Sequence, residues 1–208
     1  GLDGSAKSSL SSRMNFPAVY LASASPRRRE LLTQIGVDFS VLNVAVDESV
    51  LTAELPSAYV RRIALAKARA GWQTLQADWR PVIGADTAVV LPSQDILGKP
   101  ESPQQAREFL SQLSGIEHQV MSAVAIVWQQ QKWLSLQVSQ VRFKTLTAAE
   151  IEWYVDTGEG KDKAGGYAVQ GLAAMFIENI NGSYSGVMGL PLFETRQLLQ
   201  QVDSVHEQ

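Results

Sequence analysis

The sequence contains no cysteine and only two histidines, His118 and His206. The lack of cysteine excludes disulfides, thiolate nucleophiles and cysteine-ligated zinc, and it favours a reducing compartment. Two histidines are too few for a histidine-rich metal centre. Any bound metal is therefore expected to be a hard cation held by oxygen ligands such as carboxylates, water and phosphate.

The chain also lacks long apolar runs and a surplus of positive charge. No run approaches the ~20 residues needed to span a bilayer, and no secretory signal is recognisable, so we predict a cytoplasmic protein with no membrane partner. A net charge of −3 gives no general attraction to nucleic acid. With 45% hydrophobic and 19% charged residues, the composition is that of a globular protein.

The length suffices for one well-buried α/β domain or for two small lobes that share a core, and we expect one domain, over residues 14–208. Residues 1–13 (GLDGSAKSSLSSR) are small, polar and unpatterned, and they precede Met14, which resembles a natural start. We therefore treat them as a disordered remnant of an expression tag.

An anion-binding turn is predicted in residues 21–32 (LASASPRRRELL). Ser25 is a suitable N-cap and Pro26 a suitable first helical residue after a short apolar strand. Such a helix start presents unpaired backbone N–H groups, and three arginines add donors for phosphate or carboxylate. A solvated basic turn is the alternative interpretation. The three arginines are Arg27, Arg28 and Arg29.

A lysine is predicted to point inward from the next helix, over residues 57–76. Lys67 falls within its apolar stripe, where its charge must be partnered or must line a cleft. The preceding segment, residues 39–46, alternates like an extended strand and ends in the acidic pair Asp47 and Glu48.

The most core-like strand spans residues 81–91 and is interrupted by polar residues. Gly84, Asp86 and Thr87 break its apolar run, which indicates close backbone approach and a carboxylate aimed into a pocket. A core aspartate satisfied by local backbone donors is the alternative.

Further elements are expected on both sides of a glycine-rich loop. Residues 161–171 combine Asp162, Lys163 and Gln170 with glycines that permit close approach to a ligand, although a surface turn is also compatible with them. Lys99 lies in another turn. The predicted elements are a helix from Ser102 to residue 113, a hairpin of residues 120–128 and 134–143, a helix over residues 147–155, a strand over residues 177–180 and a last helix entered at residues 189–191.

Together these residues describe a site for an anionic ligand and a divalent metal. Phosphoanhydride hydrolysis needs cations beside the phosphates, carboxylates to hold Mg²⁺ or Mn²⁺, and a base to orient water. The chain has no P-loop, dinucleotide fingerprint or nucleophilic Ser or Cys constellation.

Six motifs in order resemble the Maf family of nucleoside triphosphate pyrophosphatases, and the match runs from about residue 18 to 199. The resemblance implies a mixed α/β fold, an elongated sheet with flanking helices in two lobes around a deep cleft, related to inosine triphosphate pyrophosphatases. The motifs are LASASPRR (21–28), GADT (84–87), GKP (98–100), DKAG (162–165), VQG (169–171) and NGSY (181–184).

The resemblance also implies roles for individual residues. Asp86 corresponds to the general base, with Lys67 and Arg27 as further catalytic residues. Glu48 and Asp86 would hold the metal, although the chain leaves open whether Asp47 or Glu48 does so. The substrate-binding positions are Ser23, Arg27, Arg28, Thr87, Lys99, Lys163 and Gln170.

Gln170 bears on the substrate. The family branch with glutamine here resembles dTTP/UTP pyrophosphatases, and the branch with glutamate resembles 7-methyl-GTP pyrophosphatases. An amide can pair with the mixed donor and acceptor edge of thymine or uracil, which permits the first assignment. The resemblance keeps open a homodimer, other non-canonical nucleotides and a role as a non-catalytic, nucleotide-binding regulator of cell division.

Overall fold

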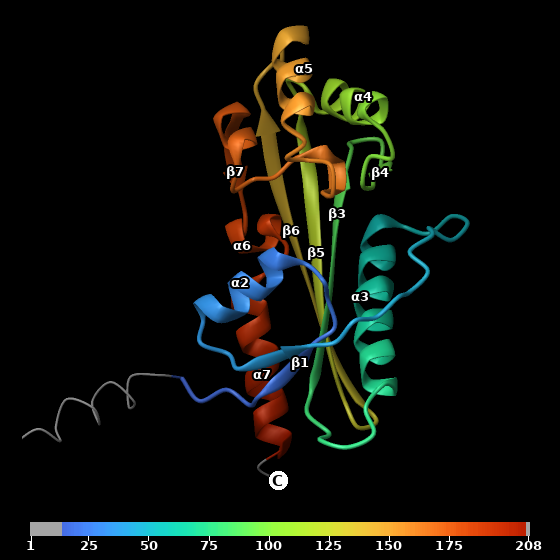
Figure 1. Ribbon diagram of the computed structural model, residues 1–208, viewed down its shortest axis with the longest axis vertical. Coiled ribbons are helices and arrows are strands. Elements are labelled where there is room, and N and C mark those ends of the chain that lie inside the picture. Colours follow the sequence, from blue (N-terminus) through green and yellow to red (C-terminus); the bar gives the residue numbers. More distant parts are fainter. Residues whose placement is uncertain (1–13, 207–208) are drawn as a thin grey trace, which may run out of the picture.

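One seven-stranded mixed sheet with flanking helices forms the protein, as predicted (Figure 1). The computed structural model describes residues 14–206, so the predicted tag lies outside the described residues. The strand order is β2-β1-β3-β5-β6-β7, and β4 pairs with β3. The strands are β1 (Val19–Leu21), β2 (Phe39–Val41), β3 (Val82–Val90), β4 (Ile96–Leu97), β5 (Glu117–Trp128), β6 (Gln131–Phe143) and β7 (Ile177–Asn181).

The helices lie on both faces and at one end of the sheet (Figure 1). They are α2 (Pro26–Gln34), α3 (Pro56–Gln73), α4 (Pro103–Leu113), α5 (Ala148–Thr157), α6 (Tyr184–Met188) and α7 (Leu192–His206), with short 3-10 turns η1 (Ala164–Gly166) and η2 (Leu172–Phe176). Every helix predicted from the sequence is present. The short elements β4, α6, η1 and η2 were not predicted, because two to five residues carry too little periodic signal.

The first strands are parallel and the later ones antiparallel. β1 pairs in parallel with both β2 and β3, while β3, β5, β6 and β7 pair antiparallel in turn. The predicted hairpin is β5 and β6, whose pairing extends from Glu117 opposite Arg142 to Trp128 opposite Gln131. The expected extended segment is only partly a strand. β2 ends at Val41, although exposure still alternates through residue 46.

Helix α3 packs on one face of the sheet, and α2 and α7 pack on the other. Val60, Ala64 and Ala68 of α3 join a cluster with apolar residues of β3 and β5. A Cβ on Gly84 would lie 2.3 Å from the Ala64 carbonyl oxygen, so only glycine allows α3 this close to β3. The predicted close backbone approach at Gly84 is therefore confirmed.

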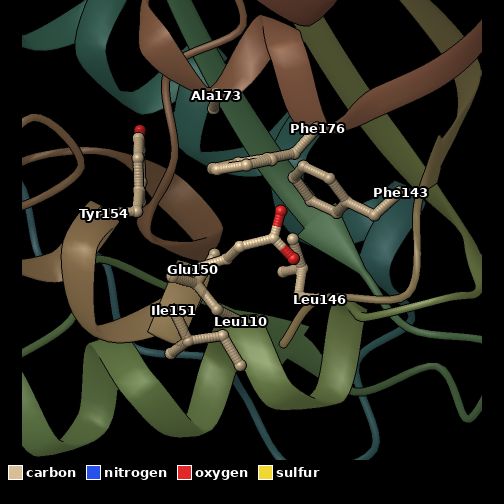
Figure 2. A pocket seen from close by; sticks show the side chains of 8 residues that line it. All are labelled: Leu110, Phe143, Leu146, Glu150, Ile151, Tyr154, Ala173 and Phe176. Carbon is tan, nitrogen blue, oxygen red and sulfur yellow. The ribbon is translucent and has the colours of Figure 1, made fainter. Parts of the chain in front are cut away.

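A second apolar cluster lies under α4 and α5, beyond the end of the parallel strands (Figure 1). Figure 2 shows a gap in it lined by eight side chains, where the Tyr154 and Phe176 rings meet edge to face at 6.3 Å between centroids. The gap has no room for a water molecule, and no predicted site residue lines it. It is therefore a packing defect of the core rather than a ligand site.

Candidate functional site

The predicted site residues meet where one edge of β3 has no strand partner. β1 pairs with this edge at Val82 and Ile83, and β4 pairs with it at Val89 and Val90. Over residues 84–88, no strand within the described part of the chain continues the sheet on this side. The gap adjoins the carboxyl end of β1, the kind of position at which open α/β sheets bind ligands.

At this gap, the side chains of Asp86 and Thr87 point to opposite faces of the sheet, because successive side chains of a strand alternate. The Asp86 side contacts Lys67 of α3, and the Thr87 side contacts Arg28 of α2. The site therefore has an acidic half and a hydroxyl half, separated by the backbone of β3.

On the acidic half, Lys67 bridges two carboxylates. Its Nζ lies 3.2 Å from Asp86 Oδ1 and 3.1 Å from Glu48 Oε1, and it donates to the Ala85 carbonyl oxygen at 3.3 Å. That carbonyl is available because β3 has no strand partner here. Lys67 thus points inward and is partnered, as its place in the apolar stripe predicted.

Burial raises the pKa of Asp86, and the positive charges of Lys67 and Arg28 oppose that shift. The nearby Glu48 carboxylate raises it further. A carboxylate with a raised pKa is a better proton acceptor than an exposed one. The alternative of an aspartate held by local backbone donors finds no support among the described contacts, because the hydrogen bond found for Asp86 comes from Lys67.

On the hydroxyl half, Arg28 is buried and engaged by protein acceptors. Its Nε donates to the Gly189 carbonyl at 2.8 Å, Nη2 to Thr87 Oγ1 at 3.2 Å and Nη1 to Ser23 Oγ at 3.4 Å. Three of its five N–H groups are therefore used. Burial lowers the pKa of Arg28, while the carboxylates of Asp86 and Glu48 act to raise it.

The same network reaches α6 through Ser122, a site neighbour that the sequence analysis missed. Ser122 is fully buried on β5, lies 2.8 Å from Thr87 Oγ1 and donates to the Gly186 carbonyl. Ser183 caps α6 by accepting from the Gly186 N–H at 2.9 Å, which gives the predicted NGSY motif a structural role. A serine inside the apolar run of β5 was the signal available in the sequence.

The remaining predicted residues lie around Arg27, at the start of α2. The Gln170 amide lies against Arg27, and with its oxygen oriented toward the guanidinium it can accept from Nε and, at 3.3 Å, from Nη2. Burial lowers the pKa of Lys163, and the charges of Arg27 and Lys99 lower it further, so these three cations are near one another. Arg29 is exposed.

The loop that carries Lys163 and Gln170 is fastened to the core by buried hydroxyl groups. Tyr154 Oη accepts from the Ala168 N–H at 3.0 Å and donates to Glu159 at 2.7 Å. Tyr167 Oη lies 2.7 Å from His118 Nε2, and burial lowers the pKa of His118 to about 4, so the ring is neutral at pH 7. These long-range contacts were not predicted from the sequence.

Glu48 and Asp86 suit a metal that takes part of its coordination from a ligand. Among residues 14–206, no group of three or more His, Asp or Glu side chains could hold a metal by itself. Yet Glu48 and Asp86 already converge on one positive charge, the Lys67 ammonium. Asp47 instead accepts from the Ser49 N–H at 2.9 Å. Two carboxylates plus phosphate oxygens are typical of Mg²⁺ sites.

No helix in the described part of the chain is long and apolar enough to cross a membrane.

The family model described as Maf-like protein matches residues 18–202. The chain belongs to this family. A dTTP/UTP pyrophosphatase of Alkalilimnicola ehrlichii is 52% identical over 191 residues, covering 90% of this chain and 94% of that protein. Another of that name, from Pseudoalteromonas translucida, is 53% identical over 184 residues, covering 88% and 96%. The family predicted from the six motifs is confirmed.

Among solved structures, the Ham1 protein of Staphylococcus aureus aligns with a TM-score of 0.44 and 14% identity, covering 61% of this chain and 71% of that one. The Vibrio cholerae protein VC0702 aligns with a TM-score of 0.35 and 12% identity, covering 59% and 62%.

Proposed function

We propose that this protein is a metal-dependent pyrophosphatase that hydrolyses dTTP and UTP. Water attacks the α-phosphorus, the bond from that phosphorus to the bridging oxygen of the β-phosphate breaks, and the products are the nucleoside monophosphate and pyrophosphate. The observation that carries this proposal is the buried Asp86 carboxylate, which shares the Lys67 ammonium with Glu48 at the open edge of β3.

Asp86 is the proposed base. Its raised pKa lets it accept a proton from the attacking water and hold that water by a hydrogen bond. Glu48 and Asp86 would bind Mg²⁺ or Mn²⁺, which when bound neutralises phosphate charge. Glu48 is preferred to Asp47 because it is the one that contacts Lys67. Lys67 would neutralise the phosphate nearest the base.

The triphosphate would lie along the basic residues at the start of α2 and in the two loops opposite. Arg27, Lys99 and Lys163 form the group of neighbouring cations, while Ser23 and Thr87 supply hydroxyl groups beside Arg28. Arg28 has two N–H groups left for a phosphate oxygen, so we assign it a role in shaping the site as well as in binding.

Gln170 would select the base. It lies against Arg27, so an amide and a guanidinium are available together to a pyrimidine edge. The names of relatives that are about 50% identical agree with the branch that carries glutamine here. A Gln170→Glu variant should lower kcat/KM for dTTP about 10-fold, because the carboxylate cannot donate to the base edge and would pair with Arg27.

The test of the proposal is release of pyrophosphate from a panel of nucleotides with Mg²⁺ or Mn²⁺. We expect dTTP and UTP to be hydrolysed in preference to 7-methyl-GTP, ITP and the other common triphosphates. Preference for 7-methyl-GTP or ITP would refute the substrate assignment. Nucleotide binding without any turnover would favour the alternative, a regulator of cell division that binds a nucleotide.

A cytoplasmic location and the absence of a nucleic-acid partner are kept as parts of this proposal, in line with the net charge of −3. A homodimer is the assembly to test for by light scattering.

A further inference from the structure

The segment that carries Glu48 has no regular structure to hold it. No helix or strand is formed between Val41 and Pro56, and residues 47–53 are all exposed. Burial of apolar side chains therefore contributes little to the position of this segment. The Glu48 side chain itself is 48% exposed, whereas that of Asp86 is 10% exposed.

Two side chains of α3 bind this segment through its backbone and through one partly buried acid. Tyr59 Oη donates to the Glu48 carbonyl oxygen at 2.7 Å. Arg62 Nη2 donates to the Ser49 carbonyl oxygen at 2.8 Å. These contacts hold the two successive peptide groups that directly follow the Cα atom of Glu48, from which its carboxylate side chain extends.

Arg62 also forms a two-point ion pair with Glu54, at the far end of the same segment. The distances are 2.7 Å from Nε to Oε2 and 2.8 Å from Nη2 to Oε1. The Glu54 side chain is only 9% exposed, and its Oε1 accepts from the Leu51 N–H at 3.1 Å. Two hydrogen bonds between one guanidinium and one carboxylate fix the relative orientation of the two groups as well as their distance, which a single surface ion pair does not.

The helix that supplies these two side chains also supplies Lys67, and its backbone crosses directly over Gly84. Helix α3 therefore holds the segment that carries Glu48, and the same helix packs against β3 at Gly84, two residues before Asp86. The separation of the two carboxylates follows from α3 rather than from the loop.

We propose that Tyr59 and Arg62 are positioning residues that hold the Glu48 carboxylate opposite Asp86 for the divalent cation. The inference rests on the proposed function in one respect, the assignment of Glu48 and Asp86 as metal ligands. Misplacing one of the two assigned carboxylates removes half of the charged ligands that residues 14–206 offer at this site.

The test measures Mn²⁺ affinity directly, from the loss of the free-ion signal in electron paramagnetic resonance. The protein is titrated alone and with a dTTP analogue that has a non-hydrolysable α,β bridge. We expect Arg62→Ala to weaken Mn²⁺ binding about 10-fold and Tyr59→Phe to weaken it by a smaller factor, as loss of partners behind metal ligands does. Arg61→Ala, at the exposed neighbouring arginine on α3, is the matched control and should bind Mn²⁺ like the wild type.

Steady-state kinetics provide a second measurement, the dependence of activity on Mn²⁺ concentration, which a general loss of stability would not change. The Mn²⁺ concentration for half-maximal activity should rise in Arg62→Ala, while kcat and KM for dTTP at saturating Mn²⁺ stay within about 2-fold of the wild type. Tyr59→Phe removes only one hydroxyl group and so keeps the test valid if Arg62→Ala folds poorly.

Combination with Glu48→Gln decides the mechanism. If Arg62 acts through Glu48, adding Arg62→Ala to Glu48→Gln should not weaken Mn²⁺ binding further. A full additional loss, or an Arg62→Ala protein that binds Mn²⁺ as well as Arg61→Ala does, overturns the inference. If Glu48→Gln itself leaves Mn²⁺ binding unchanged, the metal site of the proposed function is wrong, which is a separate outcome.

Discussion

The two halves of the site use the same strand in different ways. On the Asp86 side, three charged groups meet, and one of them, Glu48, is about half exposed on a segment without regular structure. On the Thr87 side, Arg28, Ser23 and Ser122 are buried, and their side chains form hydrogen bonds with one another, with Thr87 and with backbone groups. The first half can exchange partners, whereas most hydrogen-bonding groups of the second are already paired within the protein.

This difference separates groups suited to chemistry from groups that maintain shape. A lysine between two carboxylates can be displaced by a metal or can move to a phosphate, because each charge finds a new partner. A buried arginine held by a carbonyl and two hydroxyl groups would leave unpaired acceptors if it moved. Substitutions on the Asp86 side should therefore change activity more than stability, and those on the Thr87 side the reverse.

The largest expected effect comes from Asp86→Asn. The amide keeps the size of the side chain but cannot accept the proton of the attacking water, so kcat should fall about 100- to 10,000-fold. Pyrophosphate release measures the effect, with circular dichroism as the check on folding. Asp47→Asn, at the neighbour of Glu48 that faces Ser49, should keep nearly full activity. Full activity in Asp86→Asn would show that the base has been misassigned.

Arg28→Met tests the other half of the comparison. The thioether keeps much of the apolar volume but removes the hydrogen bonds that Arg28 donates to the Gly189 carbonyl and to two hydroxyl groups, so the free energy of unfolding should fall by about 3 kcal/mol. Urea denaturation measures it. Arg29→Met, at an exposed position, should stay within about 0.5 kcal/mol of the wild type. Equal denaturation midpoints for the two variants would contradict a shape-maintaining role for Arg28.

The pH dependence of stability should also distinguish the halves. Because burial raises the pKa of Asp86 above that of an unfolded aspartate, the folded state binds more protons between the two values. This carboxyl therefore makes the protein less stable as pH rises through that window, while activity that needs the carboxylate rises. Urea midpoints should show this destabilisation in the wild type and not in Asp86→Asn. The same slope in both proteins would rule out Asp86 as its source.

The smallest expected effect is that of Ser122→Ala. Loss of its hydroxyl group leaves the Gly186 carbonyl without this donor and should lower the free energy of unfolding by about 1 kcal/mol, with kcat changed less than 3-fold. Denaturation by urea and a dTTP assay measure the two quantities. Ser204→Ala, at an exposed position of α7, is the control and should lie within about 0.5 kcal/mol of the wild type. A loss of activity larger than the loss of stability would place Ser122 in the chemistry.

Much of this site could be predicted from local patterns. Ser25 and Pro26 marked the start of α2, and the lysine inside an apolar stripe marked an inward charge. The polar break in the apolar run of β3 marked Asp86 and Thr87, and the six motifs in order identified the family. Apart from the order of the motifs, these signals are local. Each depends on residues within about one or two helical turns or within a single strand.

The partners of those residues could not be predicted. Tyr59 and Arg62 reach residues 48 and 49 across a loop, and Arg28 meets Gly189 from the other end of the chain. No periodicity relates positions so far apart, because their proximity follows from how α2, α3 and α6 pack on the sheet. The expected division into two lobes around a cleft stays a prediction.

The sequence by itself determined which residue types are present, where helices begin and which charges interrupt apolar faces, since these depend on side-chain chemistry and on periods of 3.6 and 2 residues. Only the tertiary structure decided that β3 has an unpaired edge between β1 and β4. That gap places Asp86 with Lys67 and Glu48 on one face and Thr87 with Arg28 on the other. The physical reason is that strand pairing is non-local. Because β1 has only three residues, it leaves the following part of the β3 edge unpaired, although β3 begins about 60 residues later in the chain.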